Sequence, residues 1–399
     1  MIKRNSRRIL TSICLGLSLF ALYLVVVETR VAAARGAVGA SSLQQTQPTE
    51  KTVEQTHKNI QVLNGLPDSQ LIPVMDFFST SLGVKCNYCH VNKDGVWAFE
   101  SDEKPEKKTA RAMVQMTVGI NKVNFRGNTD VSCFTCHRGR TQPMGVPQFP
   151  LAESAPRPEN GGNAGAAKEV MPTADQVIDK YTAALGDAAT IEKITSRVIK
   201  GSGQGANGAT FAYEAYQVVP AKIYVMLSGP RLGVIERGYE GTGNAGWEKR
   251  GGGVHDLEGE QLAALFRYPG LVRGTRLKSL YSRVSFGGKD KIDERDVYVL
   301  RATTSDNKRE RLYFDAQTGL LVRRIMSTPT PIGVVPEQVD YADYRDVEGI
   351  KMPFTIKVSS LNGNNSATLK FTEIKLNMPV DEAKFKKPNP PAAATPAKP

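Results

Sequence analysis

The sequence contains few of the residues that usually bind metals, with only four histidines and five cysteines in 399 residues. It also lacks a concentrated basic or acidic tract, because its 52 Lys and Arg and its 40 Asp and Glu residues are spread along the whole chain. The net charge of +12 therefore indicates solubility and docking to an acidic partner or a membrane surface, not binding to nucleic acid. The scarcity of histidine and cysteine makes their positions informative.

The chain also lacks a recognisable set of catalytic residues. His255 has Asp256 beside it, but no serine or cysteine nucleophile is marked near them, and we interpret "RGGGVHDLEG" as a solvated loop. The glycine-rich stretch "GYEGTGNAGWEKRGGG" lacks the strand, turn and helix context of a phosphate-binding loop, and hairpin turns explain it better. We therefore predict that the protein is not an enzyme.

The length of the chain exceeds what one ordinary hydrophobic core fills, so two domains are expected. Residues 143–172 are rich in Pro, Gly and Ala and show no lasting period, which predicts a linker. The expected domains are residues 51–142 before the linker and residues 173–388 after it. Residues 389–399 are predicted to be a disordered tail.

The N-terminus carries the pattern of an export signal. Four basic side chains between Lys3 and Arg8 precede an uncharged, apolar run over residues 9–27, and residues 32–34 are alanines typical of a cleavage site. The run is close to the ~20 residues that span a bilayer, so residues 1–34 are either a signal peptide or an uncleaved membrane anchor. Either form places the protein in the periplasm, free or anchored to the inner membrane.

Four of the five cysteines lie in two Cys-x-x-Cys pairs, each followed directly by a histidine. These are Cys86 and Cys89 with His90, and Cys133 and Cys136 with His137. An oxidising compartment favours disulfides, and two such pairs also suit a zinc site. Neither alternative requires a histidine at the next position, although two of the four histidines stand there.

Covalent attachment of haem c does require this histidine. Two thiols one helical turn apart reach the two vinyl groups of one porphyrin, and the adjacent imidazole binds the iron. Such attachment follows export, in agreement with the N-terminal segment. We therefore predict two covalently bound haem c groups, one at each motif, with His90 and His137 as iron ligands.

A predicted helix before the first motif offers a sixth ligand to its iron. Asp68 or Ser69 is suited to cap this helix, and Gly83 is suited to end it. Its apolar residues recur at helical spacing, and one of them is Met75. The helix can lie along one face of the haem while the turn carries the cysteines to the other face. Packing in the core is the alternative role for this methionine.

The unit of helix, turn and Cys-x-x-Cys-His is repeated before the second motif. Pro105 suits the first turn of a second helix, on which Met113 and Met116 share an apolar face. Aligning "MVQMTVGIN" with "MDFFSTSLG" pairs Met113 with Met75. Met113 is therefore the predicted sixth ligand of the second haem, and Met116 is the alternative.

Three segments of this region together carry a family resemblance. They are "NIQVLNGLPDSQLIPVMDFFSTSLGVKCNYCHV", "EKKTARAMVQMTVGINK" and "CFTCHRG". Over residues 51–145 the chain resembles the cytochrome c subunit of the photosynthetic reaction centre, in particular the two-haem relatives of that subunit. The resemblance implies a methionine on a helix as sixth ligand, with Met75 and Met113 at the matching positions. It also implies a periplasmic subunit that passes electrons to the oxidised pigment pair.

The number of haem motifs affects which redox partner is expected. The best-known members of that family carry four haems, and this chain has motifs for two. A general periplasmic electron carrier, or a subunit of a respiratory or dehydrogenase system, fits the same residues. The predicted partners are therefore redox proteins, among them a membrane reaction centre or a respiratory complex.

After the linker, alternating apolar and polar residues are typical of strands and predict an antiparallel sheet. The segments "RLYFDAQTGLLVRR", "DYRDVEGIKMPFTIKV" and "FTEIKLNMPVDEAKFKKP" resemble periplasmic lipoprotein-carrier domains, in which a curved sheet wraps around a helix and holds acyl chains. The predicted fold is a mainly α-helical multihaem cytochrome c domain followed by an α+β domain with a curved antiparallel sheet, an open half-barrel.

Three functions are compatible with these features. The first is a periplasmic or membrane-anchored dihaem cytochrome that transfers single electrons. The second is a periplasmic protein that binds a hydrophobic ligand or a partner through the sheet domain, with accessory haems. The third is a haem peroxidase-like enzyme, which requires an open or displaceable sixth position. We favour electron transfer.

Overall fold

The computed structural model describes residues 50–143, 170–243, 245–266, 277–305, 307–361 and 366–389. The predicted signal or anchor, residues 144–169 of the linker region, and all but the first residue of the predicted tail lie outside these residues. None of the helices in the described ranges combines the length and the hydropathy needed to cross a membrane.

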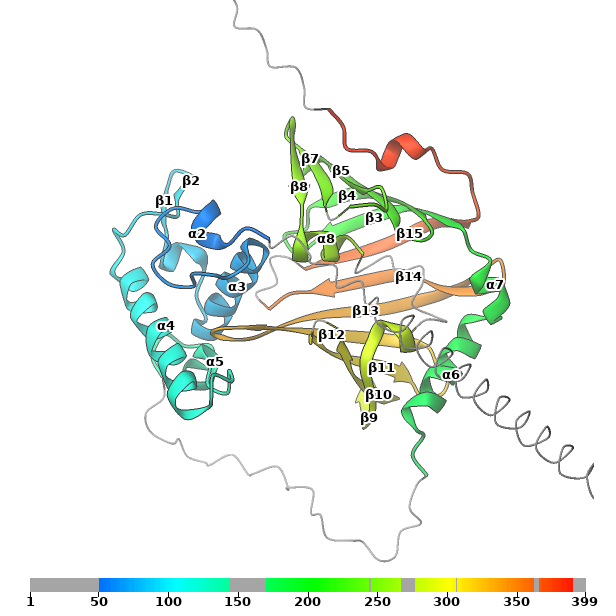
Figure 1. Ribbon diagram of the computed structural model, residues 1–399, viewed down its shortest axis with the longest axis horizontal. Helices are drawn as coiled ribbons and strands as arrows, with labels where there is room; N and C mark the ends of the chain where they lie inside the picture. The colour runs from blue at the N-terminus through cyan, green and yellow to red at the C-terminus, as the bar shows by residue number, and fades with distance from the viewer. Residues whose placement is uncertain are drawn as a thin grey trace, which may run out of the picture. The chain divides into compact units, whose positions relative to one another are not determined.

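The segment that holds both cysteine motifs contains helices and one small hairpin (Figure 1). Its helices are α2 Val53–Thr56, η1 Asp68–Gln70, α3 Leu71–Leu82, η2 Cys86–Tyr88, α4 Pro105–Asn124 and α5 Cys133–His137. Its strands are β1 Val91–Lys93 and β2 Val96–Ala98, which pair antiparallel. Each cysteine motif thus begins at the start of a short helix that follows a longer one.

Helix α3 forms in the predicted segment and ends at Gly83, as predicted. The predicted cap at Asp68 or Ser69 is wrong, because both residues lie in the preceding turn η1 and α3 begins after Gln70. Val74 and Phe77 lie on one face of the helix and are buried, together with Val114 of α4. Gly83 adopts the left-handed conformation with φ +68°, and its N–H donates to the carbonyl of Ser79. This conformation suits glycine, because a side chain there would meet the following carbonyl.

The second part of the chain is dominated by one antiparallel sheet. Its strands are β3 Ser196–Gly205, β4 Thr210–Val218, β5 Lys222–Gly229, β6 Gly233–Tyr239, β7 Gly246–Arg250, β8 Gly253–Leu257, β9 Tyr281–Ile292, β10 Arg295–Thr304, β11 Arg309–Asp315, β12 Leu321–Thr330, β13 Gly333–Val347, β14 Ile350–Ser359 and β15 Ala367–Leu376. Its helices are α6 Ala174–Leu185, α7 Ala188–Glu192, α8 Gly259–Leu265, η3 Lys278–Leu280 and η4 Glu382–Phe385.

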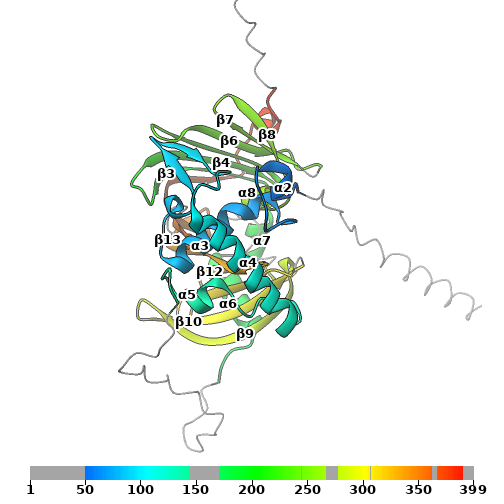
Figure 2. The same ribbon diagram turned by 90° about the vertical axis from the view of Figure 1, so that its left-hand side faces the viewer.

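The strands form two meanders that join in the middle of the sheet. The order is β8-β7-β6-β5-β4-β3-β15-β14-β13-β12-β11-β10-β9, and every neighbouring pair is antiparallel. Among the described strands, β8 and β9 are the two edges, at opposite ends of the sheet (Figures 1 and 2). The predicted antiparallel sheet is therefore confirmed, and it is not closed into a barrel.

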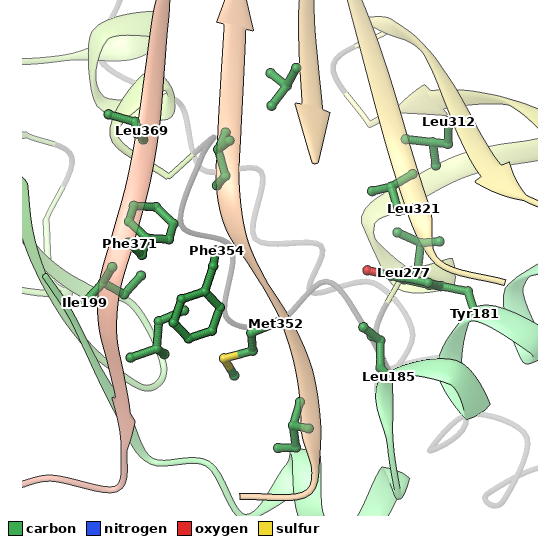
Figure 3. Close-up of a cluster of buried hydrophobic side chains, with 14 of the residues drawn as sticks. Tyr181, Leu185, Ile199, Leu277, Leu312, Leu321, Met352, Phe354, Leu369 and Phe371 are labelled. Atoms are coloured by element: carbon green, nitrogen blue, oxygen red, sulfur yellow. The ribbon is translucent and has the colours of Figure 1, made fainter. Parts of the chain in front are cut away.

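The core of this sheet lies under helix α6. The helix begins at a capping box, in which Gln176 N–H donates to Thr173 Oγ1 at 3.2 Å and Thr173 N–H donates to Gln176 Oε1 at 2.8 Å. Tyr181 and Leu185 of α6 belong to the same buried cluster as Phe354 of β14 and side chains of β3 and β15 (Figure 3). Burying these apolar surfaces is the main force that holds the helix on the sheet.

The interpretation of "RGGGVHDLEG" as a loop is wrong. His255 lies in strand β8 and pairs with Glu248 of β7. The turn between the two strands consists of Gly251 and Gly252, with φ +57° and +84°, which is the two-residue hairpin turn that a pair of glycines allows. The many glycines in this stretch hide the alternating pattern of two short strands, β7 and β8, which pair in the sheet.

Candidate functional site

The first cysteine motif forms a single tight turn after α3. The N–H groups of Cys89 and His90 both donate to the carbonyl of Cys86, at 3.3 and 3.0 Å. Cys86 is exposed, and Cys89 is half-buried. One turn therefore carries both thiols and the imidazole, as the spacing predicts.

The second motif is the short helix α5. Ser132 precedes it in a capping box with Thr135, whose Oγ1 accepts from the Ser132 N–H at 3.0 Å. Cys133 and Cys136 are three residues apart in this helix, so they share one of its faces. The helix is followed by Arg138 in the left-handed conformation, which turns the chain away after the histidine.

Each motif histidine is held by a backbone carbonyl. The Nδ1–H of His90 donates to the carbonyl of Phe99 at 3.2 Å, and that of His137 donates to the carbonyl of Arg140 at 2.9 Å. This hydrogen bond fixes the tautomer and leaves Nε2 as the nitrogen that can bind a metal. Both imidazoles therefore have the arrangement that an axial ligand requires.

An apolar cavity of about 250 Å³ lies beside the second motif. Cys133, Cys136 and His137 line it from one side, and Met113 and Met116 of α4 line it as well. These methionines are 37% and 47% exposed, although both belong to an apolar face of the helix. The structure thus brings the predicted ligand Met113 together with the second motif, and it places the alternative Met116 in the same cavity.

The first motif reaches this cavity through one cysteine. Cys89 lines it, next to Phe78 and Leu82 of α3. Cys86 instead lines a separate, more open cavity of about 820 Å³. Met75 lies half-buried on α3 and lines neither cavity. Of the predicted ligands and anchors of the first haem, these two cavities hold the cysteines alone, one in each.

Burial controls the protonation of the motif thiols. It raises the pKa of the Cys133 thiol to about 11. Burial also raises the pKa of Cys89, and the charge of Glu106 acts in the same direction. At His90 burial lowers the pKa of the imidazole, and the nearby cation of Lys107 lowers it further, against the Phe99 hydrogen bond. The neutral forms are favoured in the unmodified chain.

A buried charge cluster beside the first motif was missed by the sequence reasoning. Lys107 on α4 is 9% exposed, and its ammonium lies 3.3 Å from Asp102 Oδ1. Arg111, one turn further along, lies 2.8 Å from the same oxygen. The signal was present in the periodicity, because Lys107 falls on the helical stripe of buried residues that continues through Val114 and Thr117.

The two motifs are joined by a close approach of the backbone. The N–H of Gly139, just after the second motif, donates to the carbonyl of Ser81 in the last turn of α3, at 2.9 Å. A Cβ atom added at Gly83 would lie 2.2 Å from the carbonyl oxygen of Gly139. The end of α3 is therefore packed directly against the chain that leaves the second motif.

Replacing Gly83 by alanine is expected to destabilise this segment. The new Cβ would clash with the Gly139 carbonyl, and the left-handed conformation alone costs an L-residue about 1–2 kcal/mol. The matched control is Gly65→Ala, since Gly65 has φ +81° and nothing within 4 Å of its added Cβ. Urea unfolding followed by circular dichroism should give a larger loss for Gly83→Ala, and equal losses would contradict the close approach.

The residues of each motif fit a covalently attached haem. All four motif cysteines are free thiols, so neither pair forms a disulfide. Nowhere in the described part of the chain do three or more His, Cys, Asp or Glu side chains gather as a site for a bare metal ion, so the two pairs do not form one zinc site there. Both motifs supply thiols and a fixed imidazole for haem c, and the second motif also has an apolar, methionine-lined cavity.

Part of the chain is similar to known cytochromes. The family model "Photosynthetic reaction centre cytochrome C subunit" matches residues 21–200. The photosynthetic reaction center cytochrome c subunit of Roseobacter denitrificans is 34% identical over 104 residues, which cover 24% of this chain and 28% of that protein. Cytochrome c-554 of Chloroflexus aurantiacus is 38% identical over 86 residues, or 20% of each chain. The resemblance stated from the motifs is confirmed, and the matched part spans less than a third of these relatives.

One solved structure is similar to about half of the chain. The LolA superfamily protein NE2245 from Nitrosomonas europaea covers 54% of this chain and 99% of its own, with 14% identity and a TM-score of 0.40.

Proposed function

We propose that this protein is a dihaem c-type cytochrome that transfers single electrons and catalyses no reaction of its own. Haem c, when bound, supplies the one-electron change between ferric and ferrous iron. The chain would contribute the covalent anchors, the residues that bind the iron, and an apolar cavity beside the second motif. No proton transfer or bond cleavage within the chain is needed for this function.

The proposal rests on one arrangement of side chains that both motifs share. In each motif, two thiols lie within one helical turn and the following imidazole donates Nδ1–H to a backbone carbonyl. A redox disulfide would use the thiols alone, and a zinc site would bring the cysteines of both motifs onto one ion, with no need for the histidines. Thioether anchors with the histidine as axial ligand account for all three residues of both motifs.

The roles of the individual residues follow from this assignment. Cys86 and Cys89 anchor the first haem, and Cys133 and Cys136 anchor the second. His90 and His137 would bind the iron of the first and the second haem. Met75 and Met113 are the proposed ligands on the helix side, where a thioether sulfur raises the reduction potential relative to a nitrogen or oxygen ligand.

The proposed domain arrangement and location complete the function. Residues 51–142 form the dihaem domain, residues 143–172 form the linker, and residues 173–388 form the sheet domain. The protein acts in the periplasm, reached through the export segment at residues 1–34. Its partner is a membrane redox complex, and the names of the matched relatives favour a reaction centre.

Haem content is the direct test. The chain is produced together with a haem c maturation system, and covalently bound haem is counted by pyridine haemochrome absorption and by the mass of the intact polypeptide. We expect two haems per chain in the unchanged protein. The double variant Cys133→Ala, Cys136→Ala is expected to carry one haem, because its first motif is untouched.

The reciprocal variant is the matched control. Cys86→Ala, Cys89→Ala should also carry one haem, and all four substitutions together should carry none. Both single-haem proteins should be reduced and reoxidised reversibly with one electron each. A chain that matures with zinc or a disulfide and without covalent haem would contradict the proposal, as would high-spin iron that turns over peroxide.

A further inference from the structure

The acceptor of the His90 hydrogen bond is shared with a buried cation. Lys107 Nζ donates to the carbonyl oxygen of Phe99 at 2.8 Å and to the carbonyl of Ser101 at 2.8 Å. The Phe99 oxygen therefore accepts from both the Lys107 ammonium and the Nδ1–H of His90. The ammonium side chain is only 11% exposed, so its charge is poorly screened by water.

The charges of this cluster do not cancel. Asp102 Oδ1 is 2.8 Å from Arg111 Nη1 and 3.3 Å from Lys107 Nζ. Arg111 also donates to the carbonyl of Asn59 at 3.1 Å. Two cations share one carboxylate, which leaves a net charge of about +1 on this trio beside the first motif.

We infer that Lys107 is a positioning residue that raises the reduction potential of the haem held by His90. The ammonium draws electron density from the Phe99 carbonyl and weakens it as an acceptor for Nδ1–H, so the imidazole becomes a poorer donor to iron. The same positive charge, held near the motif at low exposure, opposes the extra positive charge of ferric iron. Both effects favour the reduced form.

The inference rests on the proposed function, because it needs a haem at the first motif. Reduction adds one electron to the iron, supplied by the redox partner, and breaks no bond in the chain. Haem counting decides whether the site is loaded, and potentiometry then decides what Lys107 does. A chain without haem would therefore refute the proposed function, whereas a loaded chain with an unaltered potential would refute only the role of Lys107.

The first variant removes the cation and keeps the length of the side chain. Lys107→Met in the full-length dihaem protein is expected to lower the potential of one haem by about 59 mV, a tenfold change in its one-electron equilibrium constant. The haem of the Cys133 and Cys136 motif serves as the internal reference and should not move. Lys108→Met is the matched control, since Lys108 is the exposed neighbour on the same helix.

The second variant separates charge from loss of structure. Asp102→Asn removes the negative charge of the cluster and keeps an oxygen that can accept from Arg111, so it should raise the potential of the same haem. A structural role would loosen the site in both variants and move the potential the same way. Opposite shifts from Lys107→Met and Asp102→Asn support the inference. Shifts of the same sign, or no shift for Lys107→Met, would overturn it.

Discussion

Met113→Ala is expected to convert the second haem from six-coordinate, low-spin iron to a high-spin form and to lower its reduction potential. Met113 lines the cavity that also holds Cys133, Cys136 and His137. Alanine cannot supply the sulfur, and a methionine ligand is one of the features that raise the potential of a c-type haem. The weak absorption band from methionine sulfur to ferric iron should fall to about half, because the other haem keeps its own ligand.

Met116→Ala is the matched control for this experiment. Met116 lies one helical turn from Met113 and lines the same cavity, so both variants remove a methionine from the same apolar surface. The control should keep the band and change the potential only slightly. If Met116→Ala loses half of the band and Met113→Ala keeps it, the two methionines exchange roles. If neither variant changes the band, methionine ligation of the second haem is wrong.

The cysteine motifs could be predicted because everything that shapes them is local. The hydrogen bonds from Cys89 and His90 to the Cys86 carbonyl stay within one turn. The end of α3 could be predicted for the same reason, since a glycine in the left-handed conformation terminates a helix without help from distant residues. Where the backbone conformation depends on a few neighbouring residues, the sequence is sufficient to predict it.

The charge cluster beside the first motif could not be predicted in this way. Lys107 meets Asp102 and the Phe99 carbonyl because α4 begins at Pro105, directly after the segment that leads out of the β1–β2 hairpin. A lysine within "EKKTAR" is interpreted by default as a solvated side chain, since lysine is almost never buried unless it is paired. The helical pattern indicates that Lys107 is buried, but its partner Asp102 precedes the helix, so the pattern does not show the ion pair.

In the sheet, too, pairings between neighbours in sequence could be predicted, and the pairing between distant strands could not. Alternating residues and turn signals locate most of the strands, and each hairpin pairs neighbours in sequence. The pairing of β3 with β15 joins Ile199 to Ile374, which no local signal specifies. It arises because the apolar faces of the two meanders bury one continuous core. The open sheet was therefore predictable as a class, and its strand order was not.

One ion pair inside that sheet differs from the many on its surface. Arg324 of β12 and Glu310 of β11 are 3% and 5% exposed, and Arg324 Nε donates to Glu310 Oε2 at 2.7 Å. The hydroxyl of Tyr281 donates to the same carboxylate oxygen from β9. The carboxylate raises the pKa of Arg324 against the effect of burial, so the arginine stays charged. Removing the carboxylate would therefore leave the buried positive charge of Arg324 without compensation.

Glu310→Ala is accordingly expected to destabilise the sheet domain by about 3–5 kcal/mol, because it leaves the buried Arg324 without its counter-charge. The matched control is Glu373→Ala, which breaks the pair with Lys375 at 3.0 Å, where the two side chains are 38% and 52% exposed. Water solvates those charges, so the control should unfold almost as the parent does. Urea unfolding followed by far-ultraviolet circular dichroism measures both. A midpoint for Glu310→Ala equal to that of the control would show that water or rearranged neighbours neutralise the buried arginine.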